Sequence, residues 1–280
     1  MSAHASSTPS DPAARSRPVR IQDLRAMKER GERFAMLTAY DYLSAQILEQ
    51  SGIPIILVGD SLGMVMLGYE STLPVTLDEM IHHTRAVRRG APTALVIADM
   101  PFGTFQGGPD QALANATRLM KETGASGVKI EGGDDMIAVT ERLVSSGIPV
   151  LAHLGLTPQS VNQFGGYRVQ GREEDAVEAM IDDARRHETA GAFAVVLEAV
   201  PSEAGRRVTE AITIPTIGIG AGPDTDAQVL VWHDLLGLTS GRLPRFVKQY
   251  ADLRSEIGSA VKTFMHEVAD GEYPGDEHVY

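Results

Sequence analysis

The sequence predicts an α/β protein folded as a TIM-type (β/α)8 barrel. Short apolar runs alternate along the chain with longer segments whose apolar residues recur at helical spacing, which is typical of a parallel sheet with crossover helices. Eight such runs occur, and eight parallel strands close a barrel. The length of 280 residues also suits this fold, whose usual size is about 250 residues. An open, doubly wound sheet is the alternative.

The predicted strands are short, and Gly, Pro or polar residues bound most of them. They cover Phe34–Thr38, Ile53–Val58, Ala94–Ala98, Gly127–Ile130, Val150–Ala152, Ala194–Leu197, Thr216–Ile219 and a weaker run at Leu235–Leu238. A continuous apolar run of this length is typical of a strand that helices cover on both faces of a parallel sheet. We therefore expect the carboxyl ends of all these strands to meet at one end of a barrel.

Helix candidates separate the strands. They cover Tyr42–Glu49, Leu77–Arg89, Asp110–Lys121, Asp134–Val144, Glu173–Thr189, Glu203–Ala211, Thr225–Val231 and a last segment from Pro244 onward. A short amphipathic helix is also expected at Ile21–Arg30, before the barrel. The last segment carries a long apolar stripe that includes Ile257, Val261 and Phe264, and this stripe either packs on its own barrel or contacts another subunit.

Composition predicts one domain with an N-terminal extension. Residues 1–18 are rich in Ser, Ala and Pro, so we predict a disordered tail there, followed by a single catalytic barrel domain over residues 19–280. The formal net charge is −12 and no basic face is evident, which disfavours nucleic acids and anionic membranes as partners. The sequence has neither a membrane-length apolar run nor the layout of a signal peptide, so a cytoplasmic location is expected.

Polar residues at the ends of the predicted strands are the candidates for a site, because barrels of this kind carry their active sites at the carboxyl ends. In chain order these residues are Asp41, Asp60, Ser61, Asp99, Lys129, Glu131, His153 and Glu198. Some have an ordinary structural interpretation. Asp41, Asp60 and Ser61 could cap the helices that follow them, and His153 could be a hydrogen-bonded core residue.

Lys129 and Glu131 lie two residues apart on one strand, so both side chains are expected to point into the barrel. They could simply neutralise each other. If Asp60, Asp99 and Glu198 share that end, however, one lysine faces an excess of buried carboxylates, which is costly. The sequence has no cysteine, so a cation there would bind oxygen or imidazole ligands. Mg²⁺ fits best, and Mn²⁺ or Co²⁺ could substitute.

Such an ion also suggests a chemistry. A divalent cation that chelates a 2-oxo acid acidifies the neighbouring C–H group, because the charge of the enolate develops next to the ion. A further carboxylate could then accept the proton. Glu198 lies on a separate strand and is the best candidate for this base.

Long motifs along the chain match a known family. They are VGDSLGM (Val58–Met64), STLPVT (Ser71–Thr76), VRRGAP (Val87–Pro92), ADMPF (Ala98–Phe102), VKIEGG (Val128–Gly133), HLGLTPQSVNQFGGYRVQGR (His153–Arg172), VLEAVP (Val196–Pro201), IGIGAG (Ile217–Gly222) and YPGDEH (Tyr273–His278). From about Phe34 to His278 the chain resembles the 3-methyl-2-oxobutanoate hydroxymethyltransferases, also called ketopantoate hydroxymethyltransferases. Motifs of this length in this order are far more specific than a lone glycine turn.

The resemblance implies a reaction and an assembly. A hydroxymethyl group would pass from the co-substrate 5,10-methylenetetrahydrofolate to 3-methyl-2-oxobutanoate through a Mg-stabilised enolate. The product, 2-dehydropantoate, belongs to the first committed step of pantothenate biosynthesis. The resemblance also implies a barrel of the phosphoenolpyruvate/pyruvate-like superfamily and a homo-oligomer, often a decamer.

The same resemblance assigns roles to residues. Asp60, Asp99 and Glu131 would hold one Mg²⁺ per subunit, directly or through water. Asp60, Ser61, Asp99 and Lys129 would contact the substrate, and Glu198 would be the proton acceptor. The alternative within enzymes is a Mg-dependent carbon–carbon lyase or mutase acting on a 2-oxo acid. Lyases of that group commonly use a cysteine as acid, which this chain lacks.

Overall fold

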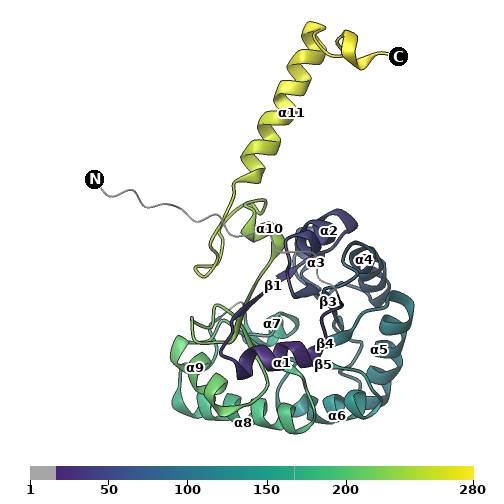
Figure 1. Ribbon diagram of the computed structural model, residues 1–280. Helices are drawn as coiled ribbons and strands as arrows, with labels where there is room; N and C mark the ends of the chain where they lie inside the picture. Colours follow the sequence, from purple (N-terminus) through teal and green to yellow (C-terminus); the bar gives the residue numbers. More distant parts are fainter. Residues whose placement is uncertain (1–16, 167) are drawn as a thin grey trace. The chain divides into compact units, whose positions relative to one another are not determined.

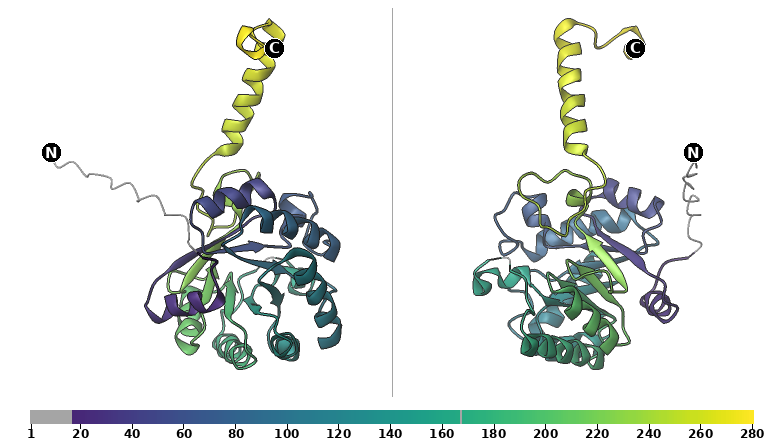
Figure 2. Two further views of the ribbon diagram at one scale, coloured as in Figure 1. Left: turned by 45° about the vertical axis from the view of Figure 1, so that its right-hand side comes forward. Right: turned by 90° about the vertical axis from the view of Figure 1, so that its left-hand side faces the viewer.

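The computed structural model describes residues 17–166 and 168–280. Its centre is a closed barrel of eight strands that follow one another in chain order. Each successive pairing, from β1 with β2 to β7 with β8, is parallel. Helices surround the barrel on the outside (Figures 1 and 2). The predicted (β/α)8 barrel is therefore confirmed, and the open doubly wound sheet is excluded.

Seven of the eight strands lie where the sequence predicts them. The strands are β1 (Phe34–Thr38), β2 (Ile55–Val58), β3 (Leu95–Asp99), β4 (Gly127–Glu131), β5 (Val150–Gly155), β6 (Ala194–Glu198), β7 (Thr216–Ile219) and β8 (Ala227–Leu230). The predictions near β8 were wrong, because the strand occupies part of the expected helix Thr225–Val231 and precedes Leu235–Leu238. Ala227 and Val229 are buried while Gln228 is exposed, a period of two that is too short to distinguish from a helix by pattern.

The longer helices fall close to their predicted positions. The helices are α1 (Ile21–Glu29), α2 (Tyr42–Gln50), α3 (Leu62–Val65), α4 (Leu77–Gly90), α5 (Pro109–Thr123), α6 (Ile137–Ser145), α7 (Val161–Phe164), α8 (Glu174–Thr189), α9 (Ser202–Ala211), α10 (Trp232–Leu235) and α11 (Leu253–Asp270), with 3₁₀ turns η1 (Asp134–Met136), η2 (Pro158–Ser160) and η3 (Asp276–His278). The four-residue helices α3, α7 and α10 were not predicted. Local chemistry sets several ends. Thr76 and Glu79 form a capping box at the start of α4, and Gly124 ends α5 with a φ of 75°.

Two buried clusters hold the barrel. One fills its interior and includes Met36, Ile55 and Leu151, with Leu24 of α1 fully buried against them. Lys28 of α1 also bonds the carbonyl of Ile214, just before β7, so α1 covers the amino end of the strands. The other cluster lies between the strands and helices α8 and α9. The polar strand ends are thus left at the opposite, carboxyl end.

The chain divides into two compact units, one extending to Val229 and the other covering Leu230–Tyr280. The second unit contains α10 and α11, and the amide of Tyr250 donates to the carbonyl of Leu235 at 2.8 Å. The single domain over residues 19–280 stays a prediction. The predicted disordered tail falls mostly on residues 1–16, which lie outside the described residues.

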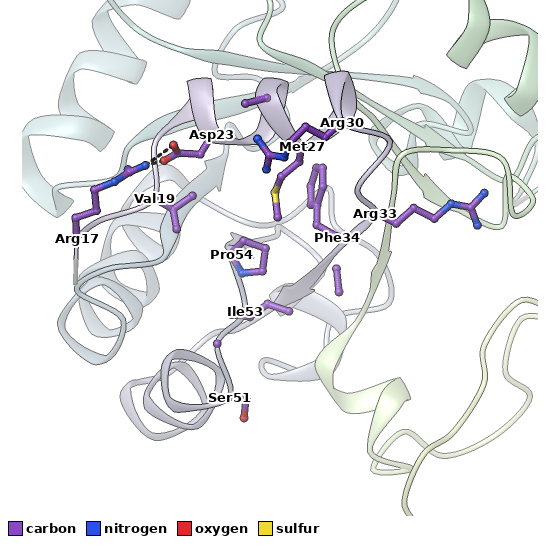
Figure 3. A pocket seen from close by; sticks show the side chains of 13 residues that line it. Arg17, Val19, Asp23, Met27, Arg30, Arg33, Phe34, Ser51, Ile53 and Pro54 are labelled. Carbon is purple, nitrogen blue, oxygen red and sulfur yellow. Dashed lines mark hydrogen bonds and ion pairs between the residues drawn. The ribbon is translucent and has the colours of Figure 1, made fainter. Parts of the chain in front are cut away.

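A hollow of about 720 Å³ opens at the amino end of the barrel (Figure 3). Met27 of α1, Phe34 of β1 and Pro54 before β2 line it, and Arg17 pairs with Asp23 at its edge. Since the predicted site residues follow the carboxyl ends of the strands, this hollow is separate from them.

Gly90, the last residue of α4, lies where α4 meets α2. A Cβ atom on this residue would collide with the carbonyl oxygen of Tyr42 and lie 2.9 Å from the Cβ of Ala45. We expect Gly90→Ala to lower the free energy of unfolding by roughly 1–3 kcal/mol through this overpacking. Arg89→Ala, on the exposed side of the same turn, should change it by less than about 0.5 kcal/mol. Urea denaturation of both variants checks the difference, and equal stabilities would contradict it.

Candidate active site

Four charged side chains are buried together at the carboxyl end of the barrel. Asp60 follows β2, Asp99 ends β3, and Lys129 and Glu131 lie on β4; each is 6% exposed or less. Strands β2, β3 and β4 are neighbours, and Asp99 is in register with Lys129. Lys129 and Glu131 share a face as the strand period predicts. The structure therefore brings together the four residues that the sequence placed there.

Lys129 links two of the carboxylates. Its Nζ atom lies 2.7 Å from Oδ1 of Asp99 and 3.2 Å from Oε1 of Glu131. Burial opposes the charge of the ammonium group, but the surrounding carboxylates raise the pKa of Lys129 above its usual value. Burial likewise disfavours the charged form of Glu131, yet the neighbouring Lys129 holds the pKa of that carboxyl down at about 2. Lys129 and Glu131 are thus an ion pair at neutral pH.

Among the described residues, Asp60 forms no ion pair with a lysine, an arginine or a histidine. Its amide donates to Oδ2 of Asp99 at 2.9 Å, which brings two acidic residues into contact. Burial, followed by the negative charges of Asp99 and Glu131, raises the pKa of Asp60 well above its usual range. Burial also raises the pKa of Asp99, although Lys129 opposes this. All three carboxyls could therefore ionise together only with more positive charge than Lys129 supplies.

Asp41 caps the helix that follows it, as the sequence suggested, whereas the side chain of Ser61 does not. Asp41 caps α2, since its side chain accepts from the amide and the hydroxyl of Ser44. Within the described part of the chain, Ser61 makes no capping hydrogen bond to α3, and its Oγ lies 2.9 Å from the hydroxyl of the buried Tyr40. Gly59 lets these groups approach, because a Cβ atom there would lie 2.8 Å from Oγ of Ser61.

His153 connects the cluster to Glu198. Nδ1 of the ring lies 3.1 Å from Nζ of Lys129 and 3.3 Å from Oε1 of Glu131, while Nε2 lies 3.4 Å from Oε2 of Glu198. Burial and Lys129 oppose protonation, but bonding to Glu131 and Glu198 raises the pKa of His153 to about 8. An ammonium group can only donate, so the neutral ring accepts at Nδ1. In both charge states, Nε2 therefore carries a proton. It lies at ion-pair distance from Glu198 and makes no hydrogen bond within the described residues.

Glu198 is the most accessible acid of the group. It ends β6, and its side chain is 18% exposed, compared with 3% for Asp99 and for Glu131. The next residue, Ala199, has a φ of 47°, a left-handed conformation that is uncommon outside glycine and frequent near functional sites. Glu198 can thus meet a ligand while its neighbours stay buried.

Gln159 is the residue of this site that the sequence did not single out. It lies in η2 after β5 and is 5% exposed. Its side chain donates to Oδ2 of Asp60, and its backbone amide donates to Oε2 of Glu131, both at 2.9 Å. No spacing pattern identifies such a contact in advance, because η2 follows a different strand from either carboxylate.

The glycine turn after β7 packs against its own chain. A Cβ atom on Gly222 would lie 2.5 Å from Oγ of Ser202, and one on Gly218 would lie 2.6 Å from Oγ1 of Thr225. These contacts account for the small residues of the turn without a phosphate or another ligand.

The donor set suits a hard cation that keeps part of its water. Among the described residues, no three Asp, Glu or His side chains form a group that could hold a metal by themselves. Mg²⁺ does not need such a group, since it commonly takes one or two carboxylates and completes its shell with water and ligand oxygens. Asp60 and Asp99 are adjacent and buried, and the carboxyl groups of the cluster outnumber its one cation, Lys129. These two aspartates therefore fit the ion best.

Comparison with known proteins then decides the family. A family model described as ketopantoate hydroxymethyltransferase matches residues 18–276. The chain belongs to this family. It is 59% identical over 264 residues to the 3-methyl-2-oxobutanoate hydroxymethyltransferase of Thermobifida fusca, covering 94% of each chain. With the protein of the same name from Streptomyces coelicolor it shares 58% identity, covering 94% of this chain and 90% of that one. Membership in the ketopantoate hydroxymethyltransferase family makes the chain an enzyme of the hydroxymethyltransferase type.

Solved structures with less similar sequences share the barrel. A phosphonopyruvate hydrolase in complex with oxalate and Mg²⁺ superposes with a TM-score of 0.60 at 14% identity, covering 94% of this chain and 92% of that one. A 2,3-dimethylmalate lyase of the PEP mutase/isocitrate lyase superfamily gives 0.57 at 18% identity, covering 93% and 91%. The predicted barrel fold is thus shared with these structures. At these identities the likeness shows the fold alone, so it does not favour the lyase or mutase alternative over the ketopantoate hydroxymethyltransferase family.

Proposed function

We propose that this enzyme transfers a hydroxymethyl group from 5,10-methylenetetrahydrofolate to 3-methyl-2-oxobutanoate, giving 2-dehydropantoate and tetrahydrofolate. This would be the first committed step of pantothenate biosynthesis, carried out in the cytoplasm. The observation that carries the proposal is the buried cluster of Asp60, Asp99, Lys129 and Glu131 beside the accessible Glu198, in a chain of this family. It joins a site for a hard cation to a carboxylate base.

The cation site would be formed by Asp60 and Asp99, with Glu131 contributing through water. When bound there, Mg²⁺ would supply Lewis-acid polarisation of the keto group of the substrate, which acidifies the adjacent C–H. Asp60, Ser61, Asp99 and Lys129 would contact the substrate. The ammonium group of Lys129, kept charged by its carboxylate neighbours, suits the carboxylate of a 2-oxo acid.

Glu198 would accept the proton from C3 of 3-methyl-2-oxobutanoate. Its greater exposure lets it reach a ligand, and the N–H at Nε2 of His153, 3.4 Å from Oε2, would attract the carboxylate. The carbon nucleophile formed in this way would attack the methylene carbon of the folate. In the overall reaction, the C3–H bond of the substrate, one O–H bond of water and both C–N bonds of the methylene carbon break. One C–C bond and one C–O bond form, and the two released protons end on the two folate nitrogens, giving tetrahydrofolate.

The test is to incubate the purified protein with 3-methyl-2-oxobutanoate, 5,10-methylenetetrahydrofolate and Mg²⁺ and to follow 2-dehydropantoate by mass spectrometry. We expect product that depends on both co-substrate and metal and disappears when EDTA removes the ion. The lyase or mutase alternative instead predicts cleavage of 2,3-dimethylmalate or phosphonopyruvate without any folate. Turnover of those compounds, with no 2-dehydropantoate formed, would overturn the proposal.

We also propose that the enzyme is a homo-oligomer, with the decamer implied by the resemblance as its assembly. An apolar face of α11 supports this, since Ile257, Val261, Phe264 and Val268 are each about half exposed. A contiguous apolar face of this kind marks an interaction surface.

No helix in residues 17–166 and 168–280 has the length and hydropathy to cross a membrane.

Phe264→Asp should shift the protein to a smaller assembly, because a carboxylate would be buried unpaired if this face is covered by another copy. Ser259→Asp is the matched control, since residue 259 lies on the opposite side of α11 at helical spacing and is exposed. Light scattering coupled to size-exclusion chromatography measures both masses. A mass unchanged by Phe264→Asp would show that this face is not the interface.

A further inference from the structure

Gln159 is a buried amide with a partner for each of its polar groups. Nε2 donates to Oδ2 of Asp60 and to the carbonyl of Met100, both at 2.9 Å, and Oε1 accepts from Nε2 of Gln106 at 3.0 Å. The contacts reach residues that follow β2 and β3 and the segment before α5. One side chain of the loop after β5 therefore joins the loop after β2 to the loop between β3 and α5.

The orientation of this amide follows from its neighbours. The Met100 carbonyl can only accept, as can the Asp60 oxygen in its ionised form, so the NH₂ group must lie on their side. The remaining contact, from Gln106, then requires the amide oxygen. Reversal would place that oxygen against two acceptors in a buried site, which is unfavourable. Gln159 is thus held in one orientation, and so is the Asp60 oxygen that it bonds.

The backbone of Gln159 contacts the other end of the acid cluster. Its N–H donates to Oε2 of Glu131 at 2.9 Å. Lys129 already ties Asp99 to Glu131, and the amide of Asp60 bonds Asp99. Gln159 completes the connection, because it holds the Asp60 carboxylate from one side and the Glu131 carboxylate from the other. A residue that makes such contacts fixes the direction of a metal-binding oxygen, although it does not bind the metal itself.

We infer that Gln159 is a positioning residue, which orients the carboxylates of Asp60 and Glu131 for the divalent cation. This inference rests on the cation site of the proposed function. Its competitor is a purely structural role, in which the amide only joins the loop after β5 to the segment around Gln106. The two roles differ in one respect: a structural tie affects stability, whereas a positioning contact affects metal affinity.

The experiment measures Mn²⁺ binding to the metal-free protein by electron paramagnetic resonance, without substrate or folate. Gln159→Met keeps the volume but removes both donors of the side chain, and we expect Mn²⁺ affinity to fall by roughly 10- to 100-fold, as for other contacts behind a metal ligand. Gln106→Met is the matched control, since it removes the bond to Oε1 and leaves the bond to Asp60 intact. Its affinity should stay within about twofold of wild type. Gln159→Asn, which keeps an amide too short to reach Asp60, replaces the methionine variant if that variant does not fold, and the same loss is expected.

The outcomes separate the inference from the proposal beneath it. Wild-type affinity in a folded Gln159→Met or Gln159→Asn protein overturns the positioning role while the cation site stands. Equal losses in the Gln159 and Gln106 variants also overturn it, in favour of the structural tie. If the wild-type protein binds no Mn²⁺, both the inference and the cation site of the proposed function are wrong.

Discussion

Replacing Glu198 by glutamine is expected to slow proton removal from C3 of 3-methyl-2-oxobutanoate by roughly 10²- to 10⁴-fold, the usual contribution of a positioned base. Glutamine keeps the size of the side chain and has no carboxylate to accept the proton. The side chain is 18% exposed, so the exchange of charge for amide should leave the fold intact. Substrate affinity is expected to change little, since the other proposed contacts remain.

The measurement isolates that step. Exchange of the C3 proton in deuterated water is followed by NMR with Mg²⁺ and without the one-carbon donor; tetrahydrofolate, which cannot react, is added to fill the donor site if the wild-type protein alone shows no exchange. Glu203→Gln on α9 is the control, because Glu203 is an exposed carboxylate that pairs with Arg206. It should exchange at the wild-type rate. An equally fast Glu198→Gln variant would remove Glu198 as the base and leave the family assignment unaffected.

The sequence predicts the scaffold and most charged groups of the site because simple periodicities govern both. Strands β2 to β7 are buried on both faces along nearly their whole length, so their apolar runs stand out. Lys129 and Glu131 face inward because residues two apart on a strand share a side. The same pattern does not predict strand β8, because Ala227–Leu230 is short and its Gln228 is exposed. Four residues do not distinguish a strand from a helical turn.

The sequence does not predict the role of Gln159, for a different reason. A glutamine after Pro158, in a loop, carries no signal of burial or of direction. Its role depends on two carboxylates that lie 99 and 28 positions earlier in the chain, and the barrel alone brings them together. His153 is an intermediate case: the sequence placed it at the end of a strand, and only the geometry shows that its ring lies between Lys129 and Glu198.

The largest effect on stability is expected for Lys129→Met. This change removes the cation that pairs with Asp99 and Glu131 and leaves their charges buried without compensation. We expect a loss of roughly 3–5 kcal/mol in the free energy of unfolding at neutral pH, measured on metal-free protein by urea denaturation. Lys121→Met, at an exposed position of α5, should cost less than about 0.5 kcal/mol. A Lys129→Met protein as stable as this control would contradict the ion-pair interpretation.

The pH dependence gives the same argument a second test. In the wild-type protein the pKa of Glu131 is lowered from 4.5 to about 2, so the stability that this ion pair contributes is present above pH 4.5 and is lost as the pH falls toward 2. Without Lys129 only the contacts with His153 and with the amide of Gln159 still lower that pKa, so the buried carboxyls protonate more readily. The stability difference between variant and wild type should therefore be largest at neutral pH and shrink in acid. Adding Asp99→Asn to Lys129→Met should also restore part of the stability, because one uncompensated charge is removed with its partner. A deficit independent of both pH and Asp99 would instead mean that the lysine acts through the packing of its alkyl chain.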